Sequence, residues 1–514
     1  MRRTPLGGLL AALLVALAFA PTAVASPVLT LRGDGSAYLR EDRFLPPASA
    51  GPARLRAGQP RNLLFARAGA QKPTVRGELA RMLAAGAIDQ ATHDERRATY
   101  ADAIGLRAKL SGARKAALGA VIRNLEEITA AGGLTVSRLP ALFETVRRNR
   151  QWWSTGPLLR NGARVSFQGS RLVWQYYAGE GLQIQWLGTF GKANGLWQGN
   201  YVASLRELVD EALALAAQRA GGVAWEYLFD FDGGRPPWVS GLAQGTAVQA
   251  IARAAAKLDE PAYLAAAKAA LGIFREAPPS GVRVATPAGA HYLIYSFAPA
   301  LRVLNGFTQA VNGLHDYAEL TADPEGAAMF AAGEAQLRAE LPAYDTGGWS
   351  RYSTARDADV HYHVVARDFL LGLCTRLSED AAPSATTGGA APVAAPVAAD
   401  PAPYCAAAQR WTAYLTKPPA LALVSRTVRG GRPAAVKVAV DKPSYVTVRV
   451  RRGGRTVARL GGRLPSGLRT LRWPRPPRRA GRYSVVIAAK DLTGRSSSGE
   501  GTLRVLKARR AGRR

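Results

Sequence analysis

The sequence predicts a multidomain, mainly α-helical protein: an (α/α) barrel or toroid with short β elements, followed by an all-β immunoglobulin-like sandwich. Amphipathic helical segments alternate with short strand-like runs over residues 197–377. Consecutive helices joined in this way pair antiparallel, and a curved array of such pairs buries their apolar faces around a central cleft. From residue 424 onward, short alternating apolar runs are separated by Gly and Pro turns, which is typical of a β-sandwich.

The chain begins with the pattern of an export signal. Arginines precede an apolar run, residues 9–20, that is too short to span a bilayer, and small residues at Ala23 and Ala25 form a cleavage pattern. We therefore expect residues 1–25 to be removed by cleavage near Ala25. The mature protein is then secreted or associated with the cell wall, and we expect no transmembrane segment in it.

The remaining boundaries follow from composition and periodicity. Val75, Leu79 and Met82 recur at helical spacing, whereas the preceding segment is rich in Pro, Gly and Arg without a clear period. The predicted units are an extended leader (26–72), an N-terminal helical region (73–150), the barrel module (151–377), an Ala/Pro-rich loop or linker (378–403), a helix that packs back on the barrel (404–423) and the basic immunoglobulin-like sandwich (424–510).

Two cysteines bracket the Ala/Pro-rich segment. Because export places Cys374 and Cys405 in an oxidising compartment, we predict a disulfide between them. Such a bond would hold the helix after the segment against the core.

The positive charge is concentrated at the C-terminus. The whole chain has a formal net charge of +31, and residues 421–514 contain 25 Lys and Arg against three acids. A charge of this size favours an acidic partner. For an exported protein, an anionic polysaccharide or a cell-wall polymer fits better than nucleic acid, and solubility alone is the alternative explanation.

The middle of the chain lacks the common catalytic motifs. It has no HExxH, nucleophile elbow, Walker loop or metal-spaced Cys/His cluster, and we predict no cofactor and no metal. Tyrosine, arginine and glutamine instead gather at the segment junctions. In the predicted helix 304–320, Asn305 begins a stripe of polar side chains that are mostly neutral, which suits a hydroxyl-rich ligand or a solvated face. Gly306 and Gly313 would allow a neighbouring helix to approach closely.

The stretch PPWVSGLAQG precedes another predicted helix. Ser240 is a suitable N-cap, and free N–H groups at this helix start would suit a carboxylate. Trp238 is a possible stacking platform for a sugar and Gln244 a possible ligand group. Tight packing of an inner helix explains the glycines equally well.

Several ordered sequence blocks resemble a known family. Residues 150–375 contain, in this order, GLQIQW, PPWVSGLAQGTAVQAIARA, LIYSFAPALRVLNGF, YDTGGWSRY and YHVVARDFL. Their order and spacing resemble the C-terminal module of the D-glucuronyl C5-epimerases, isomerases that convert D-glucuronate to L-iduronate within heparosan-type polysaccharides. The resemblance implies an (α/α) barrel with a β-rich portion ahead of it and a cleft for an anionic uronate-containing polysaccharide.

The resemblance also implies site residues. Tyr295 and Tyr362 are the proton-transfer candidates, Tyr352 lies beside them, and Tyr177 matches a further cleft tyrosine. Tyrosine becomes a workable base where a cation favours the phenolate, and in its neutral form it is a ready acid. The residues expected to position the substrate are Gln183, Gln185, Trp238, Gln244, Asn305, Arg356 and His363.

The chain departs from the family pattern at three points, of which one is that Arg356 follows Tyr352 at a slightly wider spacing than the family's arginine. Ile294 stands where the animal enzymes have an acidic residue before the tyrosine matched to Tyr295, and Ala366 replaces a second histidine. A glucuronate-containing exopolysaccharide is therefore an alternative polymer. Two other functions fit the residues: a polysaccharide lyase that eliminates the C4 substituent after the same proton abstraction, and an inactive polysaccharide-binding protein.

Overall fold

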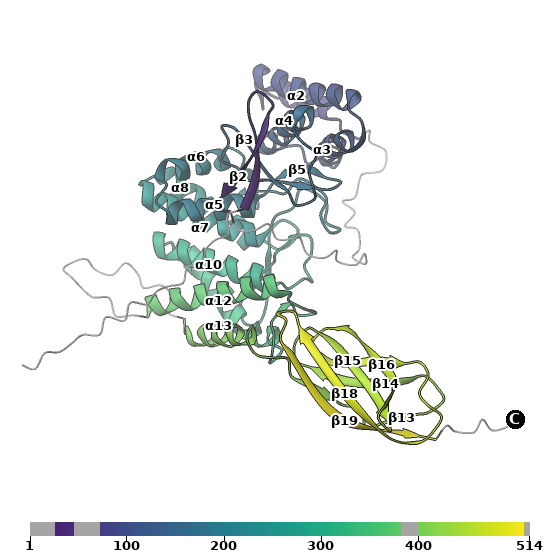
Figure 1. The fold of residues 1–514 in the computed structure, drawn as a ribbon. Helices are drawn as coiled ribbons and strands as arrows, with labels where there is room; N and C mark the ends of the chain where they lie inside the picture. Colours follow the sequence, from purple (N-terminus) through teal and green to yellow (C-terminus); the bar gives the residue numbers. More distant parts are fainter. Residues whose placement is uncertain (1–25, 46–71, 382–398, 508–514) are drawn as a thin grey trace, which may run out of the picture.

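The computed structural model describes residues 26–45, 72–381 and 399–507, so the predicted signal peptide and most of the predicted linker lie outside the described residues. Figure 1 shows a helical body and an elongated β domain that extends from it. Buried apolar side chains form one large cluster in the body and a separate cluster in the β domain. No helix within the described ranges is long and apolar enough to cross a membrane.

Four helices occupy the region predicted to be helical over residues 73–150. They are α1 (Val75–Ala84), α2 (Gln90–Lys109), α3 (Gly112–Ala130) and α4 (Leu139–Thr155), with a short 3₁₀ turn, η1 (Val136–Arg138), before α4. Side-chain caps fix two of the helix starts. Thr74 accepts a hydrogen bond from the N–H of Gly77, and Asp89 accepts one from Thr92.

The body also contains a five-stranded sheet, whose strands lie in the order β2-β1-β3-β4-β5. Its strands are β1 (Ser26–Leu31), β2 (Ala37–Asp42), β3 (Arg164–Phe167), β4 (Trp174–Tyr177) and β5 (Gly181–Ile184). β1 pairs with β3 in parallel, and the other pairs are antiparallel. The prediction of an extended leader is therefore wrong for residues 26–42. A strand whose partner lies over 130 residues further along the chain gives no local signal.

The rest of the body is a succession of packed helices: α5 (Trp186–Gln198), α6 (Val202–Leu213), α7 (Gly241–Leu258), α8 (Pro261–Ala269), α9 (Gly272–Arg275), α10 (Leu304–Thr321), α11 (Pro324–Glu340), α12 (Val360–Asp380) and α13 (Ala402–Tyr414). Helices α5, α7, α10, α12 and α13 pack in this order, and α6, α8 and α11 each pack on the helix before them (Figure 1). The body therefore combines helices and sheet, as predicted.

Short strand pairs and a 3₁₀ turn connect these helices. They are β6 (Ala217–Arg219) with β7 (Gly222–Ala224), β8 (Arg283–Ala285) with β9 (Ala290–Tyr292), β10 (Arg351–Ser353) with β11 (Arg356–Asp357), and the turn η2 (Leu341–Tyr344). The aromatic-rich run over residues 223–231 is mostly not a strand. Only Gly222–Ala224 forms a strand, and the aromatic residues that follow pack in the core.

Helices α7 and α10 approach each other through glycine. A Cβ at Gly313 would overlap the carbonyl oxygen of Gly245, and a Cβ at Gly245 would stand 2.7 Å from the Cα of Ala310. The predicted close approach is confirmed at Gly313. Gly306 instead faces Ile294, whose side chain would be 3.0 Å from an added Cβ.

Gly313→Ala should lower the free energy of unfolding by about 1–3 kcal/mol or more, because the backbones of α7 and α10 must separate. Gly105→Ala is the matched control, since nothing lies within 4 Å of a Cβ at that position of α2. There the loss of backbone freedom in the unfolded chain should stabilise by about 0.5–1 kcal/mol. Thermal unfolding measures both, and equal effects would contradict the close packing.

The predicted disulfide between Cys374 and Cys405 is confirmed. It joins α12 to α13, whose residue Trp411 is fully buried in the main core. The helix α13 (Ala402–Tyr414) therefore packs back on the body, whereas Leu421–Leu423, at the end of the predicted unit 404–423, form a strand of the β domain.

The β domain contains a three-stranded sheet, β12-β14-β17, and a five-stranded sheet, β13-β19-β18-β15-β16. Its strands are β12 (Leu421–Leu423), β13 (Thr427–Arg429), β14 (Ala434–Val440), β15 (Ser444–Arg452), β16 (Arg455–Leu464), β17 (Gly467–Trp473), β18 (Gly481–Asp491) and β19 (Ser496–Leu506). Alternate residues of both sheets share one buried core. The immunoglobulin-like designation stays a prediction.

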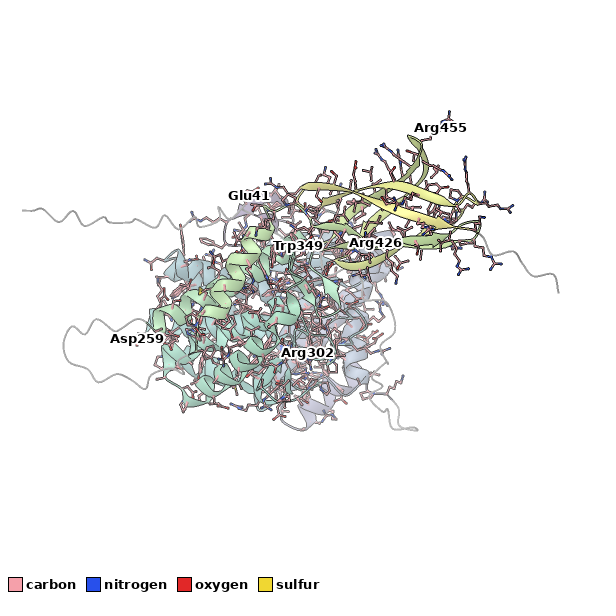
Figure 2. All side chains as sticks on the ribbon, turned by 90° about the horizontal axis from the view of Figure 1, so that it is seen from below. Glu41, Asp259, Arg302, Trp349, Arg426 and Arg455 are labelled. Carbon is pink, nitrogen blue, oxygen red and sulfur yellow. A yellow bond between two sulfur atoms is a disulfide. The ribbon has the colours of Figure 1, made fainter. Side chains whose placement is uncertain are left out.

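The β domain is anchored to the strand pair β10–β11. Ser466 donates to Asp357 from its backbone N (2.6 Å) and from its Oγ (2.8 Å). Thr346 donates to the carbonyl of Asp441, and Lys442 donates to two carbonyls near the end of α13. Figure 2 shows Trp349 where the helical body meets the β domain. The contact is thus made at a segment that contains predicted site residues.

Candidate active site

Three of the predicted tyrosines meet, although they come from separate segments. Tyr295 follows β9, Tyr352 lies in β10, and Tyr362 lies in the first turn of α12. The rings of Tyr352 and Tyr362 are 4.7 Å apart, and Tyr352 is hydrogen-bonded to Tyr295. Tyr295 and Tyr352 are buried, whereas Tyr362 is half-buried. We call these three residues the tyrosine cluster.

The start of α7 holds Tyr295 in place. Ser240 accepts a hydrogen bond from Ala243 and is the predicted N-cap. The N–H of Gly241 donates to the carbonyl of Leu293. Val239 and Ser296 exchange two hydrogen bonds, one of them through the Ser296 Oγ. The stretch PPWVSGLAQG therefore fixes both sides of Tyr295. Of the N–H groups predicted to be free at this helix start, those of Gly241 and Ala243 have partners within the protein.

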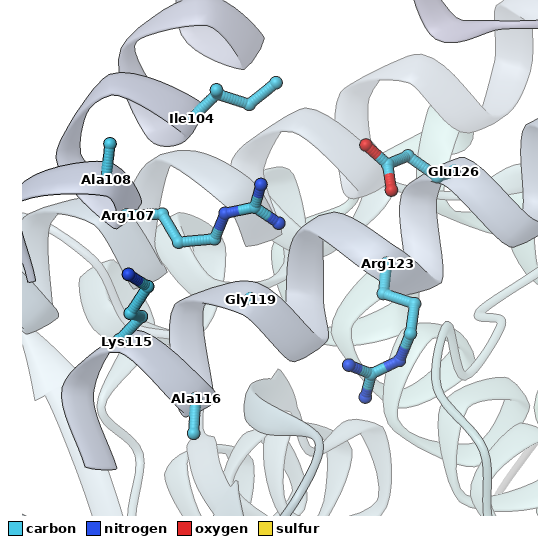
Figure 3. A pocket seen from close by; sticks show the side chains of 8 residues that line it. All are labelled: Ile104, Arg107, Ala108, Lys115, Ala116, Gly119, Arg123 and Glu126. Atoms are coloured by element: carbon cyan, nitrogen blue, oxygen red, sulfur yellow. The ribbon is translucent and has the colours of Figure 1, made fainter. Parts of the chain in front are cut away.

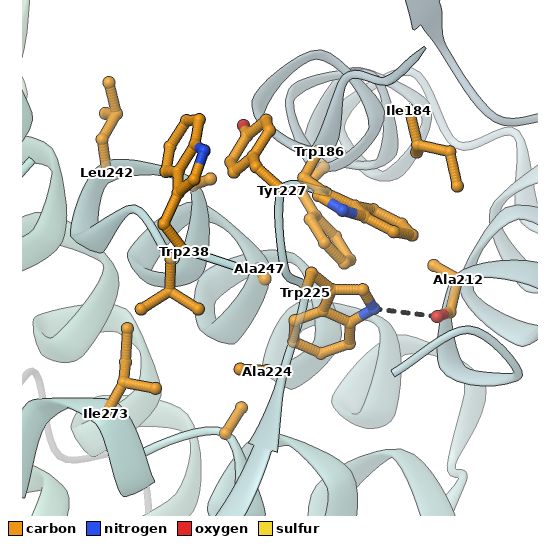
Figure 4. Close-up of a cluster of buried hydrophobic side chains, with 14 of the residues drawn as sticks. Ile184, Trp186, Ala212, Ala224, Trp225, Tyr227, Trp238, Leu242, Ala247 and Ile273 are labelled. Atoms are coloured by element: carbon orange, nitrogen blue, oxygen red, sulfur yellow. Dashed lines mark hydrogen bonds between the residues drawn. The ribbon is translucent and has the colours of Figure 1, made fainter. Parts of the chain in front are cut away.

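An aromatic wall lies behind the cluster. Trp238 stacks on Tyr227 with ring centroids 4.3 Å apart, as Figure 4 shows, and its ring is 5.6 Å from that of Tyr295. Only 4% of Trp238 is exposed, and its Nε1 donates to the carbonyl of Phe229. Trp238 is therefore part of the core, and its role as a stacking platform for a sugar stays a prediction.

Tyr177 lies on the other side of this wall. Its ring is 4.6 Å from Phe229 and 6.4 Å from Phe231, and Phe231 in turn contacts Tyr295 at 5.6 Å. Burial raises the pKa of Tyr177 to about 12, against the opposing effects of a hydrogen bond with Gln185 and the charge of Arg164. Tyr177 is thus near the cluster, separated from it by an aromatic ring.

Arg356 provides positive charge at the cluster. Its guanidinium lies 4.4 Å from the ring centroid of Tyr352. Burial and the neighbouring Tyr362 raise the pKa of Tyr352, whereas Arg356 opposes this shift. Burial raises the pKa of Tyr295 well above its ordinary value, and the other two tyrosines raise it further. In the free protein the Tyr295 phenol therefore remains protonated, ready to donate a proton.

Asp232 is a site residue that the sequence reasoning missed. It has a left-handed conformation, with φ of 49°, in the turn between Phe231 and Gly234, which form a β-bridge. Its negative charge raises the pKa of both Tyr295 and Tyr352. Ile294, in contrast, is buried against α10. A carboxylate therefore lies near the cluster from a different segment, and the turn sequence FDGG was the available signal.

Three of the predicted substrate-binding residues are buried and hydrogen-bonded to other groups of the protein. Gln244 bridges the carbonyls of Val223 and Ala270 through its Nε2. Gln183 donates to the carbonyl of Glu180 and is 2% exposed. His363 is fully buried. Each of the three satisfies buried backbone or side-chain groups of the protein, and its contact with a substrate stays a prediction.

Gln185, Asn305 and Arg356 keep their positions at or near the cluster. Gln185 caps α5 by accepting from the N–H of Gly188, and it also bonds Tyr177. Asn305 is buried in the first turn of α10, next to Gly306. Of these three residues, Arg356 is the one that contacts the tyrosine cluster directly.

The polar stripe of α10 is a helix–helix network. Gln309 donates to Gln249 of α7, and Asn312 donates to the carbonyl of Phe369 in α12. Asp316 accepts from Arg253 and Arg376. These side chains are buried, so both the hydroxyl-rich ligand and the solvated face are excluded for this part of the stripe.

One group of described residues has donor atoms close enough for a metal. Ligand atoms of His315, Glu319 and Asp380 lie within 4.8 Å of one another. His315 already bonds Asp380 at 2.8 Å and approaches Asp316 at 3.4 Å. His315 and Glu319 lie in the later turns of α10 and Asp380 is the last residue of α12, whereas Asn305 lies in the first turn of α10.

The environment of His363 gives a pH-dependent prediction. Its Nδ1 accepts from Ser350 Oγ (2.7 Å), its Nε2 donates to the carbonyl of Trp411 (2.9 Å), and its ring stacks on Trp349. Burial lowers the pKa of His363 to about 4. Because the folded pKa lies below the unfolded value of about 6.5, the neutral imidazole stabilises the fold above pH 6.5, and this contribution is lost as the pH falls toward 4.

Between pH 7 and pH 4, the free energy of unfolding should therefore decrease by up to about 3 kcal/mol through His363 alone. His363→Gln should be less stable at pH 7 but lose less stability on acidification. His361→Gln, two residues away and exposed, should keep the wild-type dependence. Chemical denaturation at both pH values measures this, and parallel pH curves for all three proteins would contradict the prediction.

A basic groove lies elsewhere, between α2 and α3 (Figure 3). It has a volume of about 640 Å³. Its lining residues are Ile104, Arg107, Ala108, Lys115, Ala116, Gly119, Arg123 and Glu126. None of the predicted site residues lines it. Arg123 also donates to the carbonyl of Gly179, close to Tyr177 in the chain.

Comparison with known families confirms the resemblance over part of the chain. Residues 220–380 match the family model described as the D-glucuronyl C5-epimerase C-terminus. The match includes Tyr295, Tyr352 and Tyr362 but not Tyr177.

A D-glucuronyl C5-epimerase of Caenorhabditis elegans is 32% identical over 130 residues, which are 23% of this chain and 21% of the relative. The chain therefore matches about one fifth of the length of this curated relative.

Among solved structures, an unsaturated glucuronyl hydrolase specific for heparin is 13% identical, with a TM-score of 0.31 over 45% of this chain and 60% of the other. The endo-β-1,4-glucanase CMCax from Acetobacter xylinum is also 13% identical, with a TM-score of 0.28 over 38% and 67%.

Proposed function

We propose that this protein is a uronate C5-epimerase that converts D-glucuronyl to L-iduronyl residues within a glucuronate-containing polysaccharide. The observation that carries the proposal is the tyrosine cluster with Arg356 over one of its rings. It lies inside the region that matches the C5-epimerase family. No activity follows from the fold alone, so the proposal rests on this site.

Inversion at C5 requires two proton transfers on opposite faces of the sugar. A base removes the C5 proton, and the electron pair of the C–H bond moves into the adjacent carboxylate, which takes up enolate character. An acid then returns a proton to C5 from the other face. In our proposal, Tyr362 is the base, since it is half-buried and its phenolate would remain partly hydrated. Tyr295, whose buried phenol stays protonated, is the acid.

Charged neighbours complete this assignment. Arg356 supplies the positive charge that favours a phenolate in the cluster and stabilises the developing enolate. Asp232 favours the neutral form of Tyr295 and Tyr352, and therefore keeps the acid protonated. After one turnover Tyr295 is ionised and Tyr362 is neutral, so exchange with solvent must restore the starting state. The reaction consequently introduces a solvent hydrogen at C5.

The remaining expectations belong to the same proposal. The helical body would be the (α/α) barrel of the family, and the β domain an immunoglobulin-like sandwich. The chain would be exported by its N-terminal signal and act outside the cell, in the secreted form or at the wall. Heparosan and an exopolysaccharide of the producing cell are the two polymer candidates.

Deuterium incorporation tests the proposal. The protein is incubated in D₂O with heparosan and with other glucuronate polymers, and C5 deuterium is measured by NMR. Deuterium at C5 without chain cleavage is the expected result. An unsaturated uronate, detected by its ultraviolet absorbance, would identify a lyase instead. If every polymer emerges unlabelled and uncut, the protein is a binding protein and the proposal fails.

A further inference from the structure

The outer face of the five-stranded sheet in the β domain is strongly basic. Strand pairing places the side chains that alternate with the buried core on this face. On β15, β16, β18 and β19, seven of them are cationic: Arg449, Arg451, Arg459, Arg463, Arg482, Lys490 and Arg504. One acid, Glu500, shares the face. No acid in the described part of the chain forms an ion pair with any of the seven, and we call them the basic face.

Strand register places several of these charges directly beside one another. Arg449 pairs with Arg459 across β15 and β16, and Arg482 pairs with Arg504 across β18 and β19. Directly opposed residues on one face stand about 5 Å apart at Cβ, and like charges at that distance destabilise a sheet. Folding alone does not favour such pairs, so they require another role.

The opposite face of the domain is different. The exposed cations of the three-stranded sheet are Lys437 and Arg472, which oppose Thr470 and Ala435 rather than each other. The charge of the domain is therefore concentrated on one of its two faces. Figure 2 shows side chains with nitrogen at their tips projecting from the domain as far as Arg455 at its outer end.

The basic face begins close to the tyrosine cluster. Its first row across the strands contains Arg463, the exposed Tyr445 and Lys490. Three residues after Arg463, Ser466 donates two hydrogen bonds to Asp357. Asp357 is the neighbour of Arg356, which covers Tyr352. From this row the face continues away from the body along β15 and β18 (Figure 1).

We infer that the basic face binds the anionic polysaccharide on which the site acts and holds it beside the tyrosine cluster. The choice of polymer rests on the proposed function. The carboxylates along such a polymer would form ion pairs with the rows of arginine. Counterions released from the polymer on binding would add to the affinity. A long polymer can contact the face and the cluster simultaneously, which raises the effective concentration of further uronates at the site.

The uncharged residues of the face favour a polysaccharide over other polyanions. Hydroxyl side chains alternate with the cations: Thr447, Ser484, Ser496, Ser498 and Thr502. They can bond sugar hydroxyls. Tyr445, 57% exposed, is the aromatic residue of the face, whereas single-stranded nucleic acid is usually bound by several stacking aromatics. The apolar side chains of the face are few: Val486 and Ala488 are half-buried and Val457 is 39% exposed, whereas a membrane-binding element presents a broad apolar surface.

Charge reversal on the two faces tests the inference. The face variant is Arg449→Glu with Arg459→Glu, and the matched control is Lys437→Glu with Arg472→Glu, which changes the net charge equally. Circular dichroism and thermal unfolding check that both variants fold. Binding of long heparosan and of a heparosan tetrasaccharide is measured by calorimetry at several salt concentrations. C5 deuterium exchange is followed with the same two ligands.

The face variant should bind long heparosan at least about tenfold more weakly than the control, with a shallower dependence on salt. Exchange on the tetrasaccharide should be unchanged, because that ligand is too short to reach from the cluster across the face. Equal losses in both variants would mean that only net charge matters and would overturn the inference. Tighter, face-dependent binding of single-stranded DNA or anionic vesicles would also overturn it.

Measuring both binding and C5 exchange distinguishes failure of the proposed binding surface from failure of the proposed activity. If heparosan binds through the face but no polymer is labelled at C5, the proposed activity fails while the surface remains. If the tetrasaccharide is labelled and both variants bind long heparosan like the wild type, the surface fails while the activity remains.

Discussion

Replacing Tyr295 or Tyr362 with phenylalanine should reduce C5 deuterium exchange by two to four orders of magnitude, the range typical for loss of a general acid or base. Each change removes one hydroxyl group and leaves the ring in its aromatic environment, where Tyr295 contacts Phe231 and Trp238. The fold should therefore persist. Exchange rates with a glucuronate polymer, together with the melting temperature of each variant, measure the effect.

Tyr201→Phe is the matched control for this experiment. Tyr201 is 41% exposed at the start of α6 and lies outside the cluster, so its exchange rate should equal that of the wild type. Retention of most of the activity in both Tyr295→Phe and Tyr362→Phe would remove the tyrosine mechanism. A loss in one variant only would assign the chemistry to a single acid–base group.

Glu226→Gln should destabilise the fold by about 3–5 kcal/mol, because it leaves buried charge uncompensated. Glu226 is 4% exposed and accepts hydrogen bonds from Arg138 (2.6 and 2.9 Å) and Arg219 (2.6 Å). These contacts connect the segment before α4 with β6 and with the aromatic wall. Chemical denaturation of the variant and the wild type measures the difference.

An exposed ion pair of the same length provides the control. Arg171 and Glu207 are also 2.6 Å apart, but both side chains are substantially exposed. Glu207→Gln should change the free energy of unfolding by less than about 1 kcal/mol, since water screens such pairs. If the two substitutions cost the same, burial is not what makes the Glu226 contacts strong.

Local patterns predicted much of the fold. The apolar period of 73–150, the helices between 197 and 377 and the alternating runs after 424 all form the expected type of element. Oxidising conditions and position were sufficient to predict the bond between Cys374 and Cys405. Ser240 could be identified as an N-cap from its place before an apolar run.

Long-range partners could not be predicted in this way. The strands of residues 26–42 pair with each other and with β3, far along the chain. Amides such as Gln244 and Gln309 looked like ligand groups because they are neutral and lie at helical spacing. Contacts between buried helices also favour neutral amides, because burying an unpaired charge costs much more free energy than burying a hydrogen-bonded amide.

The tyrosine cluster could be predicted only through the resemblance. Periodicity explains none of the three tyrosines, and each alone could be an amphipathic residue at the end of an element. Their meeting depends on how the start of α7, the strand β10 and the start of α12 pack together. Asp232 escaped notice because its neighbours in the chain suggested only a turn.

Because a disulfide joins α12 to α13, the stretch of chain between these helices is not needed to hold them together. Cys374 and Cys405 join these helices covalently 31 residues apart. Each doubling of the number of residues between two fixed ends costs only about 0.6 kcal/mol. We therefore expect insertions and deletions to be tolerated in the Ala/Pro-rich segment. Helix α13 would stay in contact with His363 through the carbonyl of Trp411. Among relatives that retain both cysteines, this segment is where we expect lengths to differ most.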